Sequence, residues 1–294
     1  MCASAAPSIR PRRSVLYMPA SRTSALEKAK SLAADALIFD LEDAVAPDAK
    51  DAARAQACAA AASGAYGKRE IVIRANGLGT PWGYADLAAI AGSGAHAALI
   101  PKVESAAMLA QAAQVLDEAG APAEMALWAM VETPLAMLQI QDIARAPRLA
   151  CLVMGTSDLA KDLQAAHTPD RLPFITGLGL CLLAARAYGL AILDGVHLNL
   201  SDDAEFRAHC EQGRDMGFDG KTLIHPKQVE PANAVFGPTE AQVEDARRII
   251  AAHAEAEAQG QGVVLLDGRL IENLHVIGAH RTVALAEAIT ALSA

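Results

Sequence analysis

Residues 125–134 read MALWAMVETP, and in this stretch an apolar run of strand length ends in a single acid. Glu132 follows the run directly, and Pro134 then stands where a helix-like segment begins. Proline is favoured in the first turn of a helix, and continuous apolar runs are typical of strands that are buried on both faces. The stretch therefore predicts a buried parallel strand with Glu132 at its carboxyl end.

The same arrangement recurs a short distance along the chain. The apolar run LACLVM at 149–154 is followed by GTSD at 155–158, which ends in Asp158. Two acids at the carboxyl ends of neighbouring buried strands are expected to converge, and Mg²⁺ is commonly held by one or two carboxylates together with water and substrate oxygens. Two interpretations stay open: Glu132 and Asp158 bind Mg²⁺, or each acid caps or charges the first turn of a helix.

Six further segments have the length and composition of strands, and helix-like segments alternate with them. They lie at residues 14–18, 36–41, 70–74, 97–102, 191–196 and 220–225. Alternation of this kind predicts parallel pairing with right-handed crossovers, and eight strands are the number in a closed (β/α)8 TIM barrel. The alternative, an open doubly wound sheet, normally has a glycine-rich phosphate turn after its first strand, and this chain has none there.

The same pattern predicts three regions. A mobile tail is expected at residues 1–13, the barrel at 14–237, and a C-terminal extension of helices and a short strand at 238–294. The extension follows the eight predicted barrel strands and is not needed to close the barrel. It is therefore expected to act as a subunit contact and an active-site lid. Within the barrel, a helix predicted over residues 47–63 places Lys50 and Arg54 on its exposed face.

Composition limits the possible functions. The chain has 294 residues, of which 53% are hydrophobic and only 4% aromatic, and its net charge is -9. These values disfavour a nucleic-acid binder, which needs a basic surface or stacking aromatic side chains. Five widely spaced cysteines without a CxxC pair predict neither zinc nor a disulfide framework, and no apolar stretch resembles a signal core or a membrane span. Cytoplasm is the expected location, with no membrane partner.

In a TIM barrel the active face lies at the carboxyl ends of the strands. The ionisable side chains that the pattern places there are Asp40, Glu42, Arg74, Lys102, Glu132, Asp158, Asp194 and His225. Structural interpretations remain open for single members of this set. Arg74 could pair with Asp40 or Glu42, Lys102 could pair with Glu42 or Glu104, Asp194 could fix a loop, and His225 could be a buried imidazole.

Seven stretches, in order along nearly the whole chain, together resemble one known family. They are RSVLYMP at 13–19, FDLEDAVAP at 39–47, IRANG at 73–77, PKVE at 101–104, VETP at 131–134, GTSD at 155–158 and KTLIHP at 221–226. The chain is thus similar to the citrate lyase beta-subunit-like family of the 2-keto-acid aldolase superfamily, which includes malyl-CoA and citramalyl-CoA lyases and malyl-CoA thioesterases. No single motif decides the substrate.

The resemblance implies a Mg²⁺-dependent TIM barrel that assembles as a homotrimer or hexamer. It places the metal on Glu132 and Asp158, a substrate-contacting guanidinium at Arg74, and the CoA nucleotide near three residues, Tyr17, Arg22 and Lys28. It also places an acid from a neighbouring subunit's C-terminal segment, Glu272 here, over the active site. Lyases of the group generally carry Asp at that position, so Glu272 is a departure that bears on the acid–base assignment.

The chemistry implied is cleavage or formation of the C–C bond in a malyl-CoA-like 3-hydroxyacyl-CoA, with glyoxylate and acetyl-CoA as products. Arg74 would stabilise the enolate oxygen, Glu272 would exchange a proton with the enolate carbon, and Glu42 would orient Arg74 or a metal-bound water. Other interpretations remain open. They are a malyl-CoA thioesterase, a citrate lyase beta subunit acting on a carrier-bound acyl group, a non-catalytic acyl-CoA-binding protein, and a free-acid aldolase.

Overall fold

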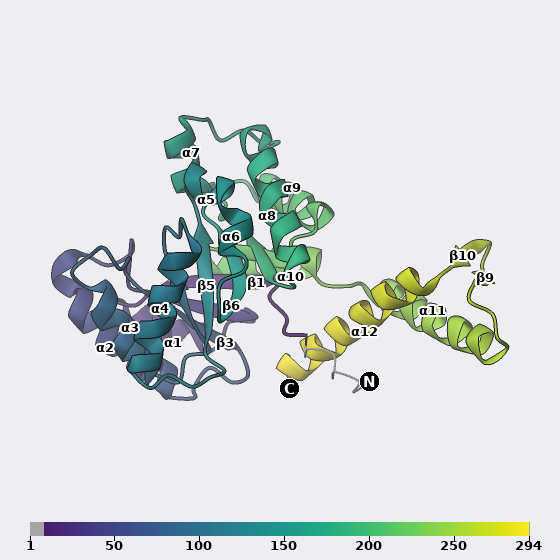
Figure 1. The fold of residues 1–294 in the computed structure, drawn as a ribbon, viewed down its shortest axis with the longest axis horizontal. Helices are drawn as coiled ribbons and strands as arrows, with labels where there is room; N and C mark the ends of the chain where they lie inside the picture. The colour runs from purple at the N-terminus through teal and green to yellow at the C-terminus, as the bar shows by residue number, and fades with distance from the viewer. Residues whose placement is uncertain (1–8, 294) are drawn as a thin grey trace. The chain divides into compact units, whose positions relative to one another are not determined.

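The computed structural model describes residues 9–293 and divides the chain into two compact units. Arg12–Phe236 form one unit, and the residues from Gly237 onward belong to the other. The first unit contains a closed eight-stranded barrel in which each strand pairs in parallel with its sequence neighbours and β1 pairs with β8 (Figure 1). The prediction of a TIM barrel is therefore confirmed, and the open doubly wound alternative is excluded.

The barrel strands lie where the apolar runs predict them. Their bounds are β1 Ser14–Pro19, β2 Ala36–Asp40, β3 Glu70–Arg74, β4 Ala97–Ile100, β5 Ala126–Val131, β6 Leu149–Met154, β7 Ala191–Asp194 and β8 Gly220–Leu223. Successive side chains of a strand point to opposite faces, so each strand contributes to two cores. One small cluster, which includes Ile38, Leu99 and Trp128, fills the barrel, and a larger cluster packs the strands against the helices.

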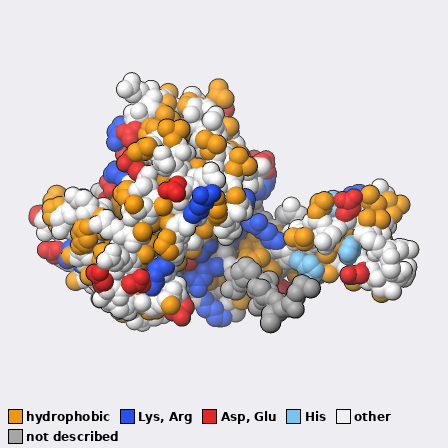
Figure 2. Space-filling view, in the orientation of Figure 1, with side chains coloured by type: hydrophobic (Ala, Val, Ile, Leu, Met, Phe, Trp, Pro, Cys, Tyr) orange, Lys and Arg blue, Asp and Glu red, His pale blue; other side chains and the backbone are white. Residues whose placement is uncertain are grey.

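The helices of the barrel unit connect the strands. Their bounds are α1 Thr23–Ala29, α2 Lys50–Ala62, α3 Gly83–Ala91, α4 Ala106–Glu118, α5 Pro134–Leu138, α6 Ile140–Ile143, α7 Thr156–Leu163, α8 Ile175–Ala187, α9 Asp203–Met216 and α10 Val229–Phe236, with 3-10 turns η1 Pro47–Ala49, η2 Leu172–Phe174 and η3 Pro226–Gln228. Figure 2 shows charged side chains of both signs among hydrophobic ones on the visible face of this unit. The exposed hydrophobic side chains include Leu138 on α5 and Leu183 on α8.

Lys50 corrects one expectation from the sequence. The predicted helix places it on an exposed face, yet it is buried, and its ammonium donates hydrogen bonds to the carbonyl oxygens of Leu41 and Glu42 at 2.8 and 2.7 Å. Arg54 is also turned inward and donates from Nε to the buried Asp86 carboxylate at 2.6 Å. Lys50 therefore holds the loop that follows β2, and Arg54 holds the start of α3. Each contact also pairs a buried polar group, which would be costly to leave unpaired.

The second unit contains two long helices and a hairpin. Helices α11 Glu240–Ala258 and α12 Asn273–Ser293 pack on each other, and strands β9 Val264–Leu266 and β10 Arg269–Ile271 pair antiparallel between them in the sequence. The role predicted for residues 238–294, a subunit contact and an active-site lid, stays a prediction. Within residues 9–293, none of the helices combines the length and the apolar character that a membrane span requires.

The expected N-terminal tail falls mostly outside the described residues. Arg12 and Arg13, at its predicted end, are fixed to the barrel by ion pairs with Glu70 and Asp35 at 2.6 and 2.7 Å. The guanidinium of Arg12 also lies 5.1 Å from the ring centre of Trp128, inside the barrel. These contacts tie Arg12 and Arg13 into the barrel unit.

Candidate active site

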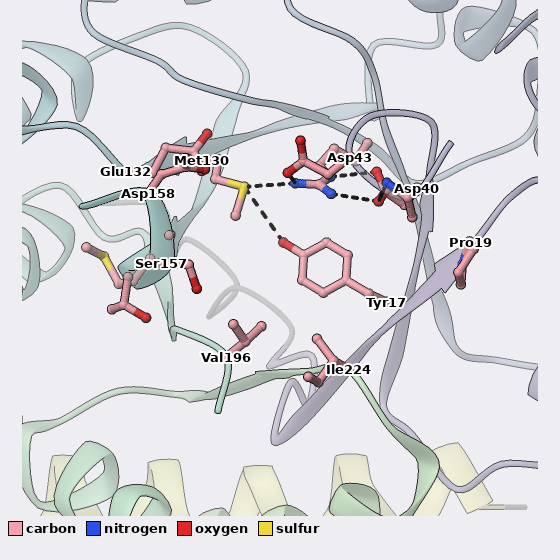
Figure 3. A pocket seen from close by; sticks show the side chains of 15 residues that line it. Tyr17, Pro19, Asp40, Asp43, Met130, Glu132, Ser157, Asp158, Val196 and Ile224 are labelled. Atoms are coloured by element: carbon pink, nitrogen blue, oxygen red, sulfur yellow. Dashed lines mark hydrogen bonds and ion pairs between the residues drawn. The ribbon is translucent and has the colours of Figure 1, made fainter. Parts of the chain in front are cut away.

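A pocket of about 350 Å³ opens among the carboxyl ends of the strands. Figure 3 shows its polar and apolar sides: Glu132 and Asp158 lie on one side, Asp40 and Asp43 on another, and Val196 and Ile224 along the bottom of the view. The full lining is Tyr17, Pro19, Asp40, Asp43, Ala44, Arg74, Met130, Glu132, Met154, Gly155, Thr156, Ser157, Asp158, Val196 and Ile224. Both acids of the proposed metal pair therefore face the same cavity.

Glu132 does not serve as a helix cap. The cap of α5 is Thr133, whose hydroxyl accepts a hydrogen bond from the backbone N–H of Ala136 at 3.2 Å. Glu132 is only 2% exposed, and its Oε1 accepts a hydrogen bond from the backbone N–H of Lys102 at 2.8 Å. The capping interpretation is thus excluded for Glu132, and its buried carboxylate is held in place by a neighbouring peptide group.

Asp158 lies in the first turn of α7, so the first-turn interpretation holds for it without excluding a metal role. It is half-buried, and its Oδ1 lies 3.2 Å from Nζ of Lys161 on the exposed side of the helix. The dipole of a helix stabilises a negatively charged side chain in its first turn. Asp158 can therefore present a carboxylate oxygen to the pocket.

The charges around the pocket fit a divalent cation. Burial raises the pKa of Glu132 to about 7, with the nearby negative charges of Glu42 and Asp158 acting in the same direction against the Lys102 N–H. Burial and nearby negative charges disfavour the ionised form of this carboxylate, and a bound cation would stabilise that form. Within residues 9–293, no group of three or more His, Cys, Asp or Glu side chains is arranged to hold a metal. Two carboxylates plus water and substrate oxygens are, however, the set that Mg²⁺ accepts.

Arg74 is the positive group of the site, and it is paired as the structural interpretation expects. Its Nε and Nη2 donate to the two oxygens of Asp40 at 2.7 and 2.6 Å, and its Nη1 lies 2.8 Å from Oε2 of Glu42. Burial alone would lower the pKa of Arg74, but Asp40 outweighs it and raises that pKa well above the usual value. Arg74 is thus permanently charged, held rigidly by Asp40, and exposed to the pocket on one side.

Tyr17 and Met130 form a wall beside Arg74. The guanidinium lies 5.0 Å from the centre of the Tyr17 ring, and the Tyr17 hydroxyl points toward the sulfur of Met130 at 3.8 Å (Figure 3). Burial raises the pKa of Tyr17, so the phenol stays neutral. Tyr17 therefore belongs to the part of the pocket that contains Arg74.

The remaining predicted residues lie in different places. Asp194 is fully buried and pairs with Arg171 and Lys221 at 2.7 Å each, so it is a structural residue. The expectation of a buried His225 is wrong, because this residue is exposed and accepts a hydrogen bond from the backbone N–H of Lys227 as the cap of η3. Lys102 pairs with Glu42 at 3.2 Å, whereas Glu104 accepts from the Thr133 hydroxyl at 2.8 Å.

Two of the predicted CoA contacts, Arg22 and Lys28, and the predicted lid acid, Glu272, are not among the residues that line the pocket. Arg22 precedes α1 and Lys28 lies in its last turn, and both side chains are exposed. Glu272 is half-buried in the second unit, directly before α12, where its backbone N–H donates to Nδ1 of His275 at 3.1 Å. The roles of these three residues stay predictions.

Sequence reasoning missed the apolar part of the site and one essential glycine. Met130, Val196 and Ile224 line the pocket but are indistinguishable in the sequence from core residues. At Gly155, a Cβ atom would lie 2.6 Å from Oε2 of Glu132 and would also overlap the Glu132 Cβ. The GTSD motif shows a glycine there, but only the fold shows which side chain needs the space.

We expect Gly155→Ala to weaken Mg²⁺ binding about 10- to 100-fold, as loss of a group that positions a metal ligand commonly does. The added methyl group must displace the Glu132 carboxylate, since the overlap involves the Cβ atom as well as the carboxylate. Calorimetric titration with MgCl₂ measures the change. Gly179→Ala on α8, where no described atom beyond the helix's own neighbouring backbone lies within 4 Å of the new Cβ, is the control and should bind Mg²⁺ as the wild type does.

The closed (β/α)8 barrel, with Glu132, Asp158 and Arg74 lining one pocket at the carboxyl ends of its strands, places the chain in the class of TIM barrels, whose active sites lie at that face. The family model described as HpcH/HpaI aldolase/citrate lyase matches residues 13–226, and the chain belongs to this family. The family predicted from the seven motifs is thereby confirmed.

Individual relatives cover the chain almost completely. A (3S)-malyl-CoA thioesterase of Cereibacter sphaeroides is 55% identical over 97% of this chain and 98% of its own length. The citrate lyase subunit beta of Leuconostoc mesenteroides is 34% identical over 94% of each chain. The structure of CitE from Mycobacterium tuberculosis in complex with magnesium, acetoacetate and coenzyme A is similar at a TM-score of 0.75, with 28% identity over 93% of this chain and 97% of that one.

Proposed function

We propose that this protein is a Mg²⁺-dependent enzyme that hydrolyses the thioester of a malyl-CoA-like 3-hydroxyacyl-CoA. The observation that carries the proposal is the pocket in which Glu132, Asp158 and the charged Arg74 face one cavity. The thioesterase that is 55% identical supports hydrolysis, and the CitE complex with magnesium and coenzyme A supports both the ion and the CoA moiety.

Glu132 and Asp158 would hold the ion, which when bound would supply the charge that fixes the carboxylate and hydroxyl oxygens of the acyl group. Arg74 lies beside that position and cannot lose its proton, so it can donate N–H groups to the thioester carbonyl oxygen as negative charge develops there. Asp40 keeps the guanidinium in a fixed orientation through two hydrogen bonds. The side chains of Met130, Val196 and Ile224 supply the apolar part of the pocket lining.

Hydrolysis requires one water molecule and one base. The water oxygen forms a bond to the thioester carbon while the base takes a proton from that water, the C–S bond breaks, and the protonated base gives its proton to the leaving CoA thiolate. We assign the base to Glu272 of a neighbouring copy, the half-buried acid that directly precedes α12. Glu42 is engaged by Arg74 and Lys102, so it suits a positioning role.

The CoA moiety would lie outside the pocket, toward the exposed Arg22 and Lys28. An exposed guanidinium and an exposed ammonium suit phosphate groups at the mouth of an otherwise acidic site. Tyr17 lines the pocket beside Arg74, so we assign it to the acyl part of the substrate and not to the adenine. The assembly would be a trimer or hexamer, which light scattering on the purified protein tests.

The second candidate is C–C cleavage of the same substrate to glyoxylate and acetyl-CoA. It is favoured by the Arg74 geometry, because a fixed guanidinium beside a bound 3-hydroxyacyl group also stabilises an enolate. The citrate lyase subunits among the relatives support this chemistry.

Incubation of the purified protein with (3S)-malyl-CoA and MgCl₂ separates the two reactions. Malate and free CoA are the expected products. Glyoxylate and acetyl-CoA as the main products would favour the lyase instead, and no reaction with any free CoA ester would favour a subunit that acts on a carrier-bound acyl group.

We expect Glu272→Gln to lower kcat by roughly 10²- to 10⁴-fold, the usual contribution of a general base. Its Mg²⁺ affinity should be unchanged, because Glu272 is assigned to the water and not to the ion. Steady-state kinetics and calorimetry measure the two quantities. A strong loss of Mg²⁺ affinity would show that its assigned role is wrong, and Glu257→Gln on the exposed surface of α11 serves as the control.

A further inference from the structure

Lys102 has an unusual backbone conformation next to the candidate metal site. It follows β4 and Pro101, and its φ is 48°, in the left-handed region that side chains other than glycine rarely adopt. Such residues persist only where the surrounding structure enforces the conformation, and they concentrate at functional sites. The conformation therefore calls for a specific reason at this position.

The backbone contacts of this turn provide the reason. The N–H of Lys102 donates to Oε1 of Glu132 at 2.8 Å, and the next N–H, that of Val103, donates to the carbonyl oxygen of Met130 at 3.1 Å. Two successive N–H groups of the turn thus donate to the end of β5. The N–H of Val103 bonds to the backbone of the strand, and the N–H of Lys102 bonds to the carboxylate of Glu132, which directly follows it. A left-handed residue lets successive N–H groups serve a neighbouring acceptor in this way.

The opposite side of Glu132 is also confined. Oε2 and Cβ of Glu132 lie against Gly155, at the end of β6, where no side chain can be accommodated. The carboxylate is therefore held between the Lys102 peptide group on one strand end and the Gly155 backbone on another. Neither contact depends on the charge of Lys102.

The ammonium of Lys102 has a different partner. Nζ lies 3.2 Å from Oε1 of Glu42, and the other oxygen of Glu42 lies 2.8 Å from Nη1 of Arg74. A glycine would adopt the turn without strain but could not provide this contact. One residue thus contacts Glu132 through its backbone and the Glu42–Arg74 pair through its side chain.

Resting on the proposed function, we infer that Lys102 is a positioning residue with two separable roles. Its left-handed peptide group orients Glu132 for Mg²⁺, and its ammonium orients Glu42 and Arg74 for the reaction. The two roles predict different responses to substitution: Mg²⁺ affinity follows the backbone preference of residue 102, whereas turnover follows its charge.

Three variants separate these roles, because all of them remove the ammonium but differ in backbone preference. Lys102→Gly and Lys102→Ala keep the N–H and can adopt the turn, so we expect their Mg²⁺ dissociation constants to agree with each other within about threefold and to be no weaker than wild type by more than that. Lys102→Val forces a β-branched residue into the left-handed region, and we expect its Mg²⁺ binding to be about tenfold weaker or more. Turnover at saturating Mg²⁺ should fall in all three, and Lys102→Arg should restore part of it.

The control is Arg148, another non-glycine residue with positive φ, at 60°, which precedes β6 away from the pocket. Calorimetry on Arg148→Gly and Arg148→Val should give wild-type Mg²⁺ affinity for both. Equal weakening in Lys102→Gly, Lys102→Ala and Lys102→Val would overturn the backbone role, and so would weakened Mg²⁺ binding in Arg148→Val. A wild-type chain that binds no Mg²⁺ would instead overturn the proposed function, and this inference with it.

Discussion

Asp158→Ala is expected to remove Mg²⁺-dependent turnover, with a fall in kcat of about a thousandfold or more, ~4 kcal/mol of transition-state stabilisation. The substitution takes away one of the two carboxylates that the pocket offers to the ion. It leaves the barrel core intact, since Asp158 lies in the first turn of α7 and forms an ion pair with the exposed Lys161. Kinetics with varied MgCl₂, together with circular dichroism to check folding, measure the effect.

Asp162→Ala is the matched control for this experiment. Asp162 lies on the same helix and contacts the same Lys161 ammonium at 3.3 Å, but it does not line the pocket. It should keep wild-type turnover. Full activity in Asp158→Ala would place the metal elsewhere, and an equal loss in both variants would trace the effect to α7 as a whole.

Glu132→Gln has the second large expected effect, and it acts in opposite directions on metal binding and on stability. Loss of the charge should abolish measurable Mg²⁺ binding. In EDTA, however, the variant should be more stable than wild type above neutral pH, because a buried carboxylate with a pKa of about 7 is costly to ionise. The glutamine side chain is nearly isosteric with glutamate, and its amide oxygen can still accept the hydrogen bond from the Lys102 N–H.

The direction with pH follows from linkage. The folded-state pKa of Glu132 lies above its ordinary value of 4.5, so the folded chain holds this proton more tightly than the unfolded chain does. Without metal, the free energy of unfolding should therefore fall as the pH rises from about 4.5 through 7, by up to ~3 kcal/mol from this group. Urea unfolding in EDTA at pH 5 and pH 8 measures the difference.

Glu132→Gln should lack this component of the pH dependence. MgCl₂ should restore stability to the wild type at pH 8 and leave the variant unchanged. If Glu132→Gln were less stable than wild type at pH 8 in EDTA, the ionised Glu132 carboxylate would not be destabilising in the absence of a cation, contrary to this account.

The barrel could be predicted from the sequence because its strands are short, apolar and regularly spaced. Residues 70–74 and 149–154 match β3 and β6 to the residue. The region around α8 is less informative, because its helix is apolar on most sides and contains Gly177 and Gly179. Gly177 lies where a Cβ would be 3.2 Å from the sulfur of Met137, a packing constraint that periodicity does not reveal.

The candidate site was predictable where it depends on charged residues at strand ends. Glu132, Asp158 and Arg74 are recognisable as charged residues in otherwise apolar surroundings, and the fold brings them to one pocket. The sequence could not decide between substrate and Asp40 as the partner of Arg74, and the structure shows the Asp40 pairing. The contributions of Gly155 and of the Lys102 peptide group depend on distances between strands, so no local pattern reveals them.

The central claim is that Glu132 and Asp158 share one divalent ion. Anomalous diffraction from crystals soaked in MnCl₂, recorded near the manganese absorption edge, tests it most directly. The account predicts one strong peak between the two carboxylates, within about 2.0–2.3 Å of an oxygen of each. No peak there, in crystals of a protein whose activity depends on the metal, would contradict it.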